Sequence, residues 1–163
     1  MSTTTIQAEQ LAEGLIKTSK QMVTAESCTG GGLSEILTRI PGSSVWFERG
    51  FVTYSNDAKM ELLNVDRKTL ELYGAVSEET AREMVCGAVN NSHAQIGVSI
   101  TGIAGPDGGT TDKPVGTVCF GWYLAEDNIR TTQIVFDGDR QSVREQSCLL
   151  ALQGLLDGIE TYL

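Results

Sequence analysis

The sequence predicts a three-layer α/β/α sandwich with a mixed β-sheet. Helical patterns alternate with short apolar strand patterns through residues 5–100, two longer strand patterns joined by a polar turn follow, and a long helical pattern ends the chain. Alternating helices and strands favour a parallel sheet covered on both faces, and a hairpin adds antiparallel strands to it. The length fits one domain, so we expect a single domain over residues 1–163.

The first helix is predicted from about Thr5 to Ser19, because apolar residues recur there at the spacing of one helical face. A short apolar run at residues 22–25 predicts a buried strand. After a run of glycines, a second apolar helical stripe ends at Pro41-Gly42, where the helix must stop. The two stripes consist of Ala8, Leu11, Ala12, Leu15 and Ile16, and of Leu33, Ile36, Leu37 and Ile40.

The next segment carries one strand and two short helices. The strand is predicted at residues 51–54, and a short helix then runs through Leu63. Asn64 is expected to end that helix, because asparagine tolerates the left-handed conformation found at helix ends. Asp66 is expected to cap another short helix that ends at Gly74.

The rest of the chain predicts a helix, three strands and a final helix. Ser77, followed by two glutamates, is an N-terminal helix signal, and an apolar stripe continues from it to about Asn91. Residues 96–100 alternate as a strand. The later elements are a hairpin formed by 115–124 and 129–136 around the turn at 126–128, and a helix from Asp139 to about Ile159.

Two glycine-rich turns, at residues 29–32 and 102–109, each follow a predicted strand. Ligands of such sheets favour the carboxyl ends of the strands, so the two turns are expected to converge on one edge of the sheet. The second turn has neither the glycine-lysine pattern of a P-loop nor the fingerprint of a Rossmann dinucleotide site. Kinase and dehydrogenase functions are therefore disfavoured.

Composition excludes several classes of partner. Acidic residues outnumber basic ones by 21 to 12, and the net charge of −9 opposes binding to a nucleic-acid backbone. We find no apolar run long enough to cross a bilayer and no signal-peptide pattern, so we expect no membrane partner and a cytoplasmic location. The cysteines show no zinc-type spacing, and Glu26, Asp107 and Asp112 match no known metal pattern, so no metal is expected.

The segment around Ser27 suggests a nucleophile. It places the hydroxyls of Ser27 and Thr29 and the thiol of Cys28 at the start of a helix, where free N–H groups stabilise an anion. A serine there can attack an acyl group while neighbouring N–H groups hold the oxyanion. Two alternatives remain open: a simple helix cap followed by glycines, and attack by the thiol of Cys28.

A base for Ser27 is harder to find. His93 is the only histidine and lies at a helix end, far in sequence from both turns. Lys59 is the best-placed alternative, but it can act as a base only if burial lowers its pKa from about 10.4 towards neutrality. Its other interpretation is a solvated lysine on a short helix. Tyr54 either relays a proton or packs in the sheet.

Substrate binding is predicted at both turns and at the last helix. Arg140 and Arg144 lie four residues apart, so they share one helix face and are placed either to grip a phosphate or to pair with Asp137, Asp139 or Glu145. A metal hydrolase is a further, weaker alternative. The candidate substrate-binding residues are Cys28, Thr29, Gly30, Gly31, Thr101, Gly102, Gly105 and Arg140.

Several longer motifs occur together and in order. They are AESCTGG at 25–31, GFVTYSNDAK at 50–59, GAVSEE at 74–79, TGIAGPDGG at 101–109 and KPVGTV at 113–118. With PGSSVWFERG at 41–50 and FDGDR at 136–140, they cover nearly the whole chain. In these motifs the chain resembles the CinA C-terminal domain family. Its departures are a third glycine at Gly32 and Asn64 where glycine is common, and neither removes a reacting group.

The resemblance implies a fold and an activity. The implied fold is α/β/α, and within the family the chain is most similar to the stand-alone nicotinamide-nucleotide amidases, because no molybdopterin-binding-like domain precedes the family domain. The implied reaction converts nicotinamide mononucleotide and water into nicotinate mononucleotide and ammonia, for salvage into NAD, without a metal or organic cofactor. Ser27 then becomes the nucleophile, Lys59 its base and Tyr54 a supporting hydroxyl. The alternative is a non-catalytic nucleotide-binding or regulatory module linked to competence or DNA damage, and in either case we expect a homodimer.

Overall fold

The computed structural model describes residues 1–162 and contains a five-stranded sheet in the order β2-β1-β3-β4-β5. β1 is parallel to both of its neighbours, β2 and β3, whereas β4 is antiparallel to β3 and β5. The predicted mixed sheet is therefore confirmed. The strands are β1 Met22–Glu26, β2 Phe47–Val52, β3 Ile96–Gly102, β4 Thr117–Ala125 and β5 Asn128–Val135.

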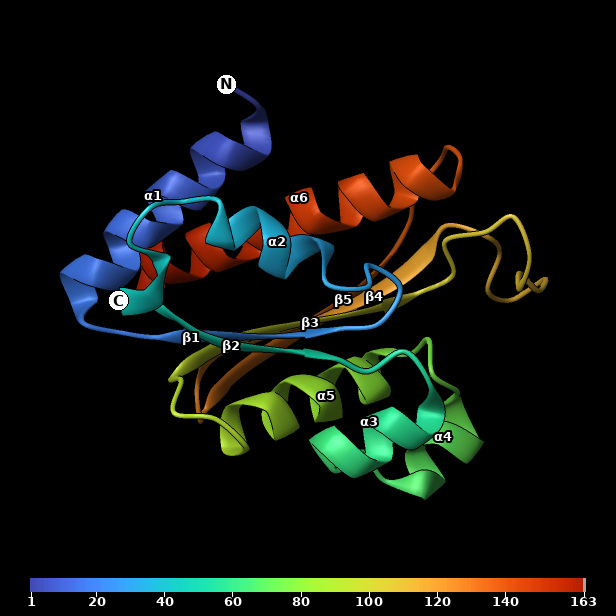
Figure 1. The fold of residues 1–163 in the computed structure, drawn as a ribbon. Coiled ribbons are helices and arrows are strands. Elements are labelled where there is room, and N and C mark those ends of the chain that lie inside the picture. Colours follow the sequence, from blue (N-terminus) through green and yellow to red (C-terminus); the bar gives the residue numbers. More distant parts are fainter. Residues whose placement is uncertain (163) are drawn as a thin grey trace.

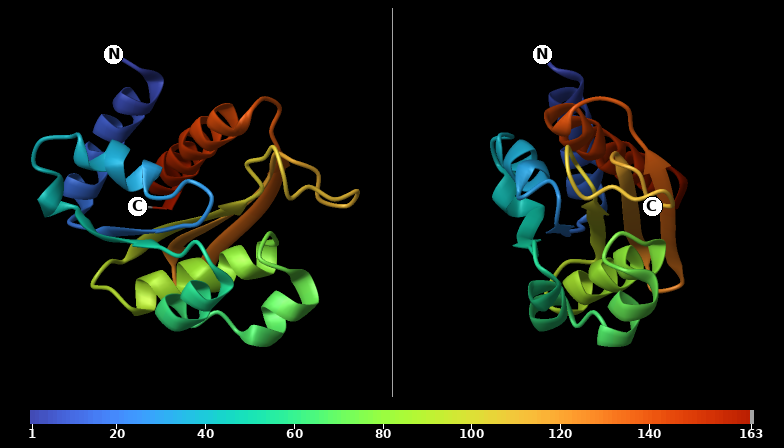
Figure 2. Two further views of the ribbon diagram at one scale, coloured as in Figure 1. Left: turned by 45° about the vertical axis from the view of Figure 1, so that its right-hand side comes forward. Right: turned by 90° about the vertical axis from the view of Figure 1, so that its right-hand side faces the viewer.

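Helices cover both faces of this sheet, which confirms the predicted three layers. Figure 1 shows α1, α2 and α6 on one face and α3, α4 and α5 on the other, and the two views of Figure 2 agree. The helices are α1 Thr3–Thr18, α2 Gly32–Thr38, α3 Asn56–Leu63, α4 Arg67–Tyr73, α5 Glu78–Asn90 and α6 Arg140–Tyr162, with a 3-10 turn at Ser43–Val45. Within residues 1–162, every helix is too short or too polar to span a bilayer.

The local signals at helix ends act as the sequence predicts. The side chain of Asp66 accepts a hydrogen bond from the N–H of Lys68, and that of Ser77 accepts one from the N–H of Thr80. Asn64 ends α3 in the left-handed conformation, with φ of 58°. Because these caps satisfy N–H and C=O groups that have no partner inside a helix, they fix where α3, α4 and α5 begin or end.

The predicted strand at residues 51–54 was wrong in its bounds. β2 begins at Phe47 and ends at Val52, and the register pairs Glu26 with Val52. The last ladder bond runs from the N–H of Thr53 to the carbonyl of Glu26, after which Ser55 caps α3. Tyr54 therefore lies outside the sheet. The hairpin turn is also tighter than predicted, because Asn128 already belongs to β5.

The core has two parts separated by the sheet. All five residues of β1 are buried, and Met22 packs in a large cluster with α1 and α6, whereas Val23 and Ala25 pack in a smaller cluster with α5. A Cβ at Gly87 of α5 would collide with the carbonyl oxygen of Leu63 at the end of α3. This close approach seats α3 against α5, and α3 carries Lys59.

Candidate active site

The carboxyl ends of β1, β2 and β3 open into a pocket of about 270 Å³. Ser27 and Cys28 follow β1, Tyr54 follows β2, Gly102 ends β3, and the loop after β3 contributes Gly105. Both glycine-rich segments therefore reach one edge of the sheet, as their positions after strands predict. Three further predicted residues, Lys59, Thr101 and Arg140, line the same pocket.

Ser27 and Lys59 meet at the base of this pocket. The backbone N–H of Ser27 donates to the carbonyl of Ile100 at 2.9 Å, which fixes the residue beside β3. The Nζ of Lys59 lies 2.9 Å from the Oγ of Ser27, and it donates to the carbonyls of Thr53 at 3.0 Å and Tyr54 at 3.3 Å. Only 1% of Lys59 is exposed, so the interpretation of Lys59 as a solvated surface residue is wrong.

The surroundings of Lys59 make its neutral form more accessible than that of a free lysine. Burial lowers the pKa of the Lys59 amine from 10.5 to about 8. A neutral amine has two N–H donors and one lone pair. The carbonyls of Thr53 and Tyr54 take up two donors, so the third direction, towards the hydroxyl of Ser27, holds the lone pair. The geometry is therefore that of a base positioned to accept the serine proton.

Arg140 spans the pocket from the first turn of α6. Its Nη1 donates to the carbonyl of Gly105 at 2.8 Å, and its Nη2 donates to the hydroxyl of Tyr54 at 3.1 Å. Arg140 thus contacts the β3 loop and Tyr54 rather than the neighbouring carboxylates suggested by the sequence. A guanidinium has five N–H donors, so three remain for an anionic ligand.

The glycines of the β3 loop are explained largely by packing within the protein. A Cβ on Gly102 would lie 2.7 Å from the Cγ2 of Val118, and one on Gly105 would collide with Val115. Thr101 is also turned away from free solvent, because its hydroxyl donates to the carbonyl of Ala75 at 2.8 Å. Gly102 and Gly105 are therefore required by close contact with Val118 of β4 and with Val115 just before that strand.

The remaining candidates lie elsewhere. Thr29, Gly30 and Gly31 are not among the residues that line the Ser27 pocket; the hydroxyl of Thr29 donates to the buried carboxylate of Glu26 at 2.7 Å. Their role in substrate binding stays a prediction. His93 lies before β3, at the amino end of that strand, and its backbone N–H donates to Glu48.

Comparison with known proteins places this arrangement in a family. Residues 4–159 match the CinA C-terminal domain. The chain belongs to the CinA C-terminal domain family. Two relatives, both named nicotinamide-nucleotide amidohydrolase PncC, come from Enterobacter agglomerans and Escherichia coli strain K12. The first is 53% identical over 132 residues, 81% of this chain and 80% of the relative; the second is 49% identical over 148 residues, 91% and 90%.

Solved structures of the CinA family share the fold. The crystal structure of competence/damage inducible protein CihA from Agrobacterium tumefaciens superposes with a TM-score of 0.93 at 39% identity, and covers 97% of this chain and 96% of that one. A Klebsiella pneumoniae protein described as competence damage-inducible protein A superposes with a TM-score of 0.95 at 33% identity, covering 99% and 100%. The α/β/α fold is therefore that of the family.

Four pocket residues of this CinA-family chain are not predicted from the sequence to bind substrate. Asn56 begins α3, Ala75 and Val76 lie between α4 and α5, and Asp107 lies in the β3 loop. The first residue of a helix and two apolar residues suggest structure rather than binding. The sequence suggests for Asp107 only a metal-ligand role, and within residues 1–162 no cluster of three or more His, Cys, Asp or Glu side chains could hold a metal ion.

Cys28 is expected to be dispensable. Burial raises the pKa of the Cys28 thiol to about 11, so the reactive thiolate is scarce at neutral pH. Replacing Cys28 with alanine should leave turnover within a few-fold of the wild-type value, and the wild type should resist inactivation by iodoacetamide. Ammonia release before and after alkylation measures both. Rapid inactivation that the Cys28→Ala variant escapes would point to the thiol instead.

Proposed function

We propose that this chain hydrolyses nicotinamide mononucleotide to nicotinate mononucleotide and ammonia, with Ser27 as nucleophile and Lys59 as its base. The relatives named nicotinamide-nucleotide amidohydrolase support the substrate, because two of them share about half of their residues with this chain over most of both lengths. The observation that carries the chemistry is the 2.9 Å contact between a buried amine and a serine hydroxyl inside one pocket.

The reaction follows from that contact. The Oγ of Ser27 attacks the carboxamide carbon while its proton passes to the neutral Nζ of Lys59. The resulting ammonium of Lys59 donates this proton to the amide nitrogen, and the C–N bond breaks. Ammonia leaves, and the acyl group remains as an ester on Ser27. Water then attacks the ester with Lys59 again accepting a proton, which yields the carboxylate and restores the serine.

The carbonyl oxygen of the amide becomes negative during both attacks and needs donors. The N–H of Ser27 is occupied by Ile100, so it is not one of them. The next two N–H groups, those of Cys28 and Thr29, form no hydrogen bond to another residue within 1–162. These two peptides are therefore the donors that we assign to the oxyanion.

Arg140 is the cation that we assign to the phosphate of the substrate. It lines the pocket, and its free donors suit the phosphate oxygens. The same residue donates to the hydroxyl of Tyr54, which lines the same pocket as Ser27 and Lys59, so phosphate binding is coupled to that tyrosine. The protein is acidic overall, with net charge −9, so a dianionic ligand needs such a local positive group.

An ammonia assay with four amides tests the proposal. Nicotinamide mononucleotide should be hydrolysed, whereas nicotinamide riboside and free nicotinamide, which lack the phosphate, should be poor substrates. NAD, in which the phosphate is esterified, is the fourth arm. Equal rates with and without the phosphate would contradict the role of Arg140, and release of ammonia from none of the four would favour a non-catalytic nucleotide-binding module.

A further inference from the structure

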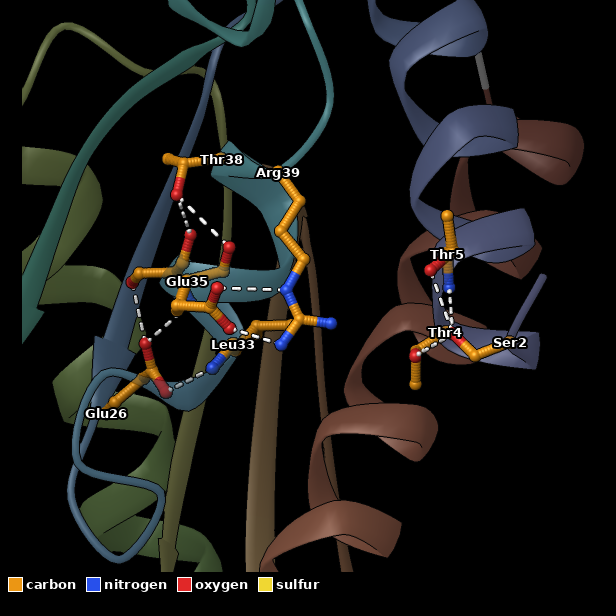
Figure 3. Close-up of polar contacts among 9 residues, drawn as sticks. Ser2, Thr4, Thr5, Glu26, Leu33, Glu35, Thr38 and Arg39 are labelled. Carbon is orange, nitrogen blue, oxygen red and sulfur yellow. Dashed lines mark hydrogen bonds and ion pairs between the residues drawn. The ribbon is translucent and has the colours of Figure 1, made fainter.

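The turn that carries Ser27 is fastened on one side by a buried carboxylate. Glu26, which is fully buried, accepts hydrogen bonds from the hydroxyl of Thr29 at 2.7 Å and the N–H of Leu33 at 2.8 Å. Its other oxygen accepts from the N–H and the hydroxyl of Ser34, at 3.0 and 2.6 Å. Figure 3 shows this carboxylate facing the start of α2. Glu26 thus ties the end of β1 to α2.

On the other side the turn is fastened by Arg144, from the second turn of α6. Its Nε donates to the carbonyl of Cys28 at 3.2 Å, and its Nη2 donates to the carbonyl of Thr29 at 3.1 Å. Arg144 forms no ion pair within residues 1–162. It lines a neighbouring groove together with Thr29 and is not among the residues lining the Ser27 pocket.

This contact fixes the direction of the peptide between Cys28 and Thr29. In a trans peptide the C=O and N–H bonds point in opposite directions. Arg144 binds the carbonyl on the side of its own groove, so the N–H of Thr29 points away from that groove. Cys28, at the other end of this peptide, lines the Ser27 pocket, and the N–H of Thr29 forms no hydrogen bond within residues 1–162.

We propose that Arg144 is a positioning residue that holds the turn with its N–H groups directed at the reacting carbonyl. This role rests on the proposed function, because it acts through the oxyanion of the amide. The guanidinium is suited to the task, since its planar fork binds two carbonyls at once. It contributes to turnover rather than to phosphate binding, which distinguishes Arg144 from Arg140.

The test compares Arg144→Ala with a matched control, Arg39→Ala. Arg39 lines the same groove but pairs with Glu35 on the surface of α2. We expect Arg144→Ala to lower kcat by about 10²-fold, the loss typical of removing one oxyanion donor, with little change in KM. Arg39→Ala should match the wild type. Millimolar guanidinium ion should restore part of the lost kcat in Arg144→Ala and should not affect Arg39→Ala.

A thioamide analogue of the mononucleotide separates the positioning role from a general loss of structure, because a general loss would lower kcat equally for the amide and the thioamide. Sulfur accepts hydrogen bonds poorly, so the Arg144→Ala loss should be much smaller for the thioamide than for the amide. Equal losses for both substrates, or an undiminished kcat, would overturn the positioning role. So would a rise in KM for the mononucleotide but not for the riboside, which would make Arg144 a phosphate ligand. Absent turnover in the wild type would instead overturn the proposed function, and this role with it.

Discussion

Replacing Ser27 with alanine is expected to lower ammonia release from nicotinamide mononucleotide by about 10⁴-fold or more, because the covalent route is lost with its nucleophile. Binding should remain close to that of the wild type. The hydroxyl of Ser27 is 2.9 Å from Lys59, and the phosphate is assigned to Arg140, so the deletion removes the attacking atom and leaves the anchor of the substrate in place.

Two measurements check this expectation. Titration calorimetry gives the affinity of Ser27→Ala for the mononucleotide, and mass spectrometry after acid quenching should find a nicotinyl-nucleotide ester on Ser27 in the wild type only. Ser44→Ala is a suitable control, because Ser44 is exposed and lies outside the pocket. Full activity in Ser27→Ala would remove this serine from the mechanism.

Most of the fold could be predicted because its signals are local. Asn64 and Ser77 act on backbone groups within a few residues of themselves, so their sequence neighbourhood is enough to place the ends of α3 and α5. β2 is different, because Phe47 to Val52 has no strong strand pattern of its own and is defined by pairing with β1. The start of that strand depends on tertiary contacts, which explains the wrong bounds.

The site, like the fold, could be predicted from the sequence only in part. The side chains of Ser27, Lys59 and Arg140 suggest their chemical roles. The burial of Lys59, however, depends on the packing of α3 on α5 and on the carbonyl groups just after β2. Ser27 and Lys59 are 32 residues apart, so no local pattern could reveal their contact. For Arg144 the sequence predicts phosphate binding or pairing with a nearby carboxylate and not the observed contact, because its partners are backbone carbonyls, which a sequence does not distinguish.

Replacing Lys59 with methionine is expected to reduce kcat by about 10³-fold or more, since within residues 1–162 no other side chain is hydrogen-bonded to the hydroxyl of Ser27. In the wild type, kcat/KM should rise with pH through an apparent pKa of about 8, because only the neutral amine accepts the proton. Lys59→Arg should be inactive at every pH, since a guanidinium stays protonated. Substantial activity in Lys59→Met, or a profile without this rise, would require another base.

The same lowered pKa predicts how stability changes with pH. Because the pKa of Lys59 is about 8 in the folded chain and 10.5 in its ordinary environment, the unfolded chain binds more protons between these two values. The buried ammonium therefore destabilises the fold below pH 8, and this cost disappears as the pH rises to 10.5. The free energy of unfolding of the wild type, relative to Lys59→Met, should increase by about 3 kcal/mol between pH 7 and pH 10.5.

Urea denaturation of both proteins across this range measures this difference in the free energy of unfolding. The contributions of the other titrating groups are the same in both proteins and cancel in the difference. A difference that does not vary with pH would mean that Lys59 keeps its ordinary pKa in the folded chain and is protonated when Ser27 must lose its proton.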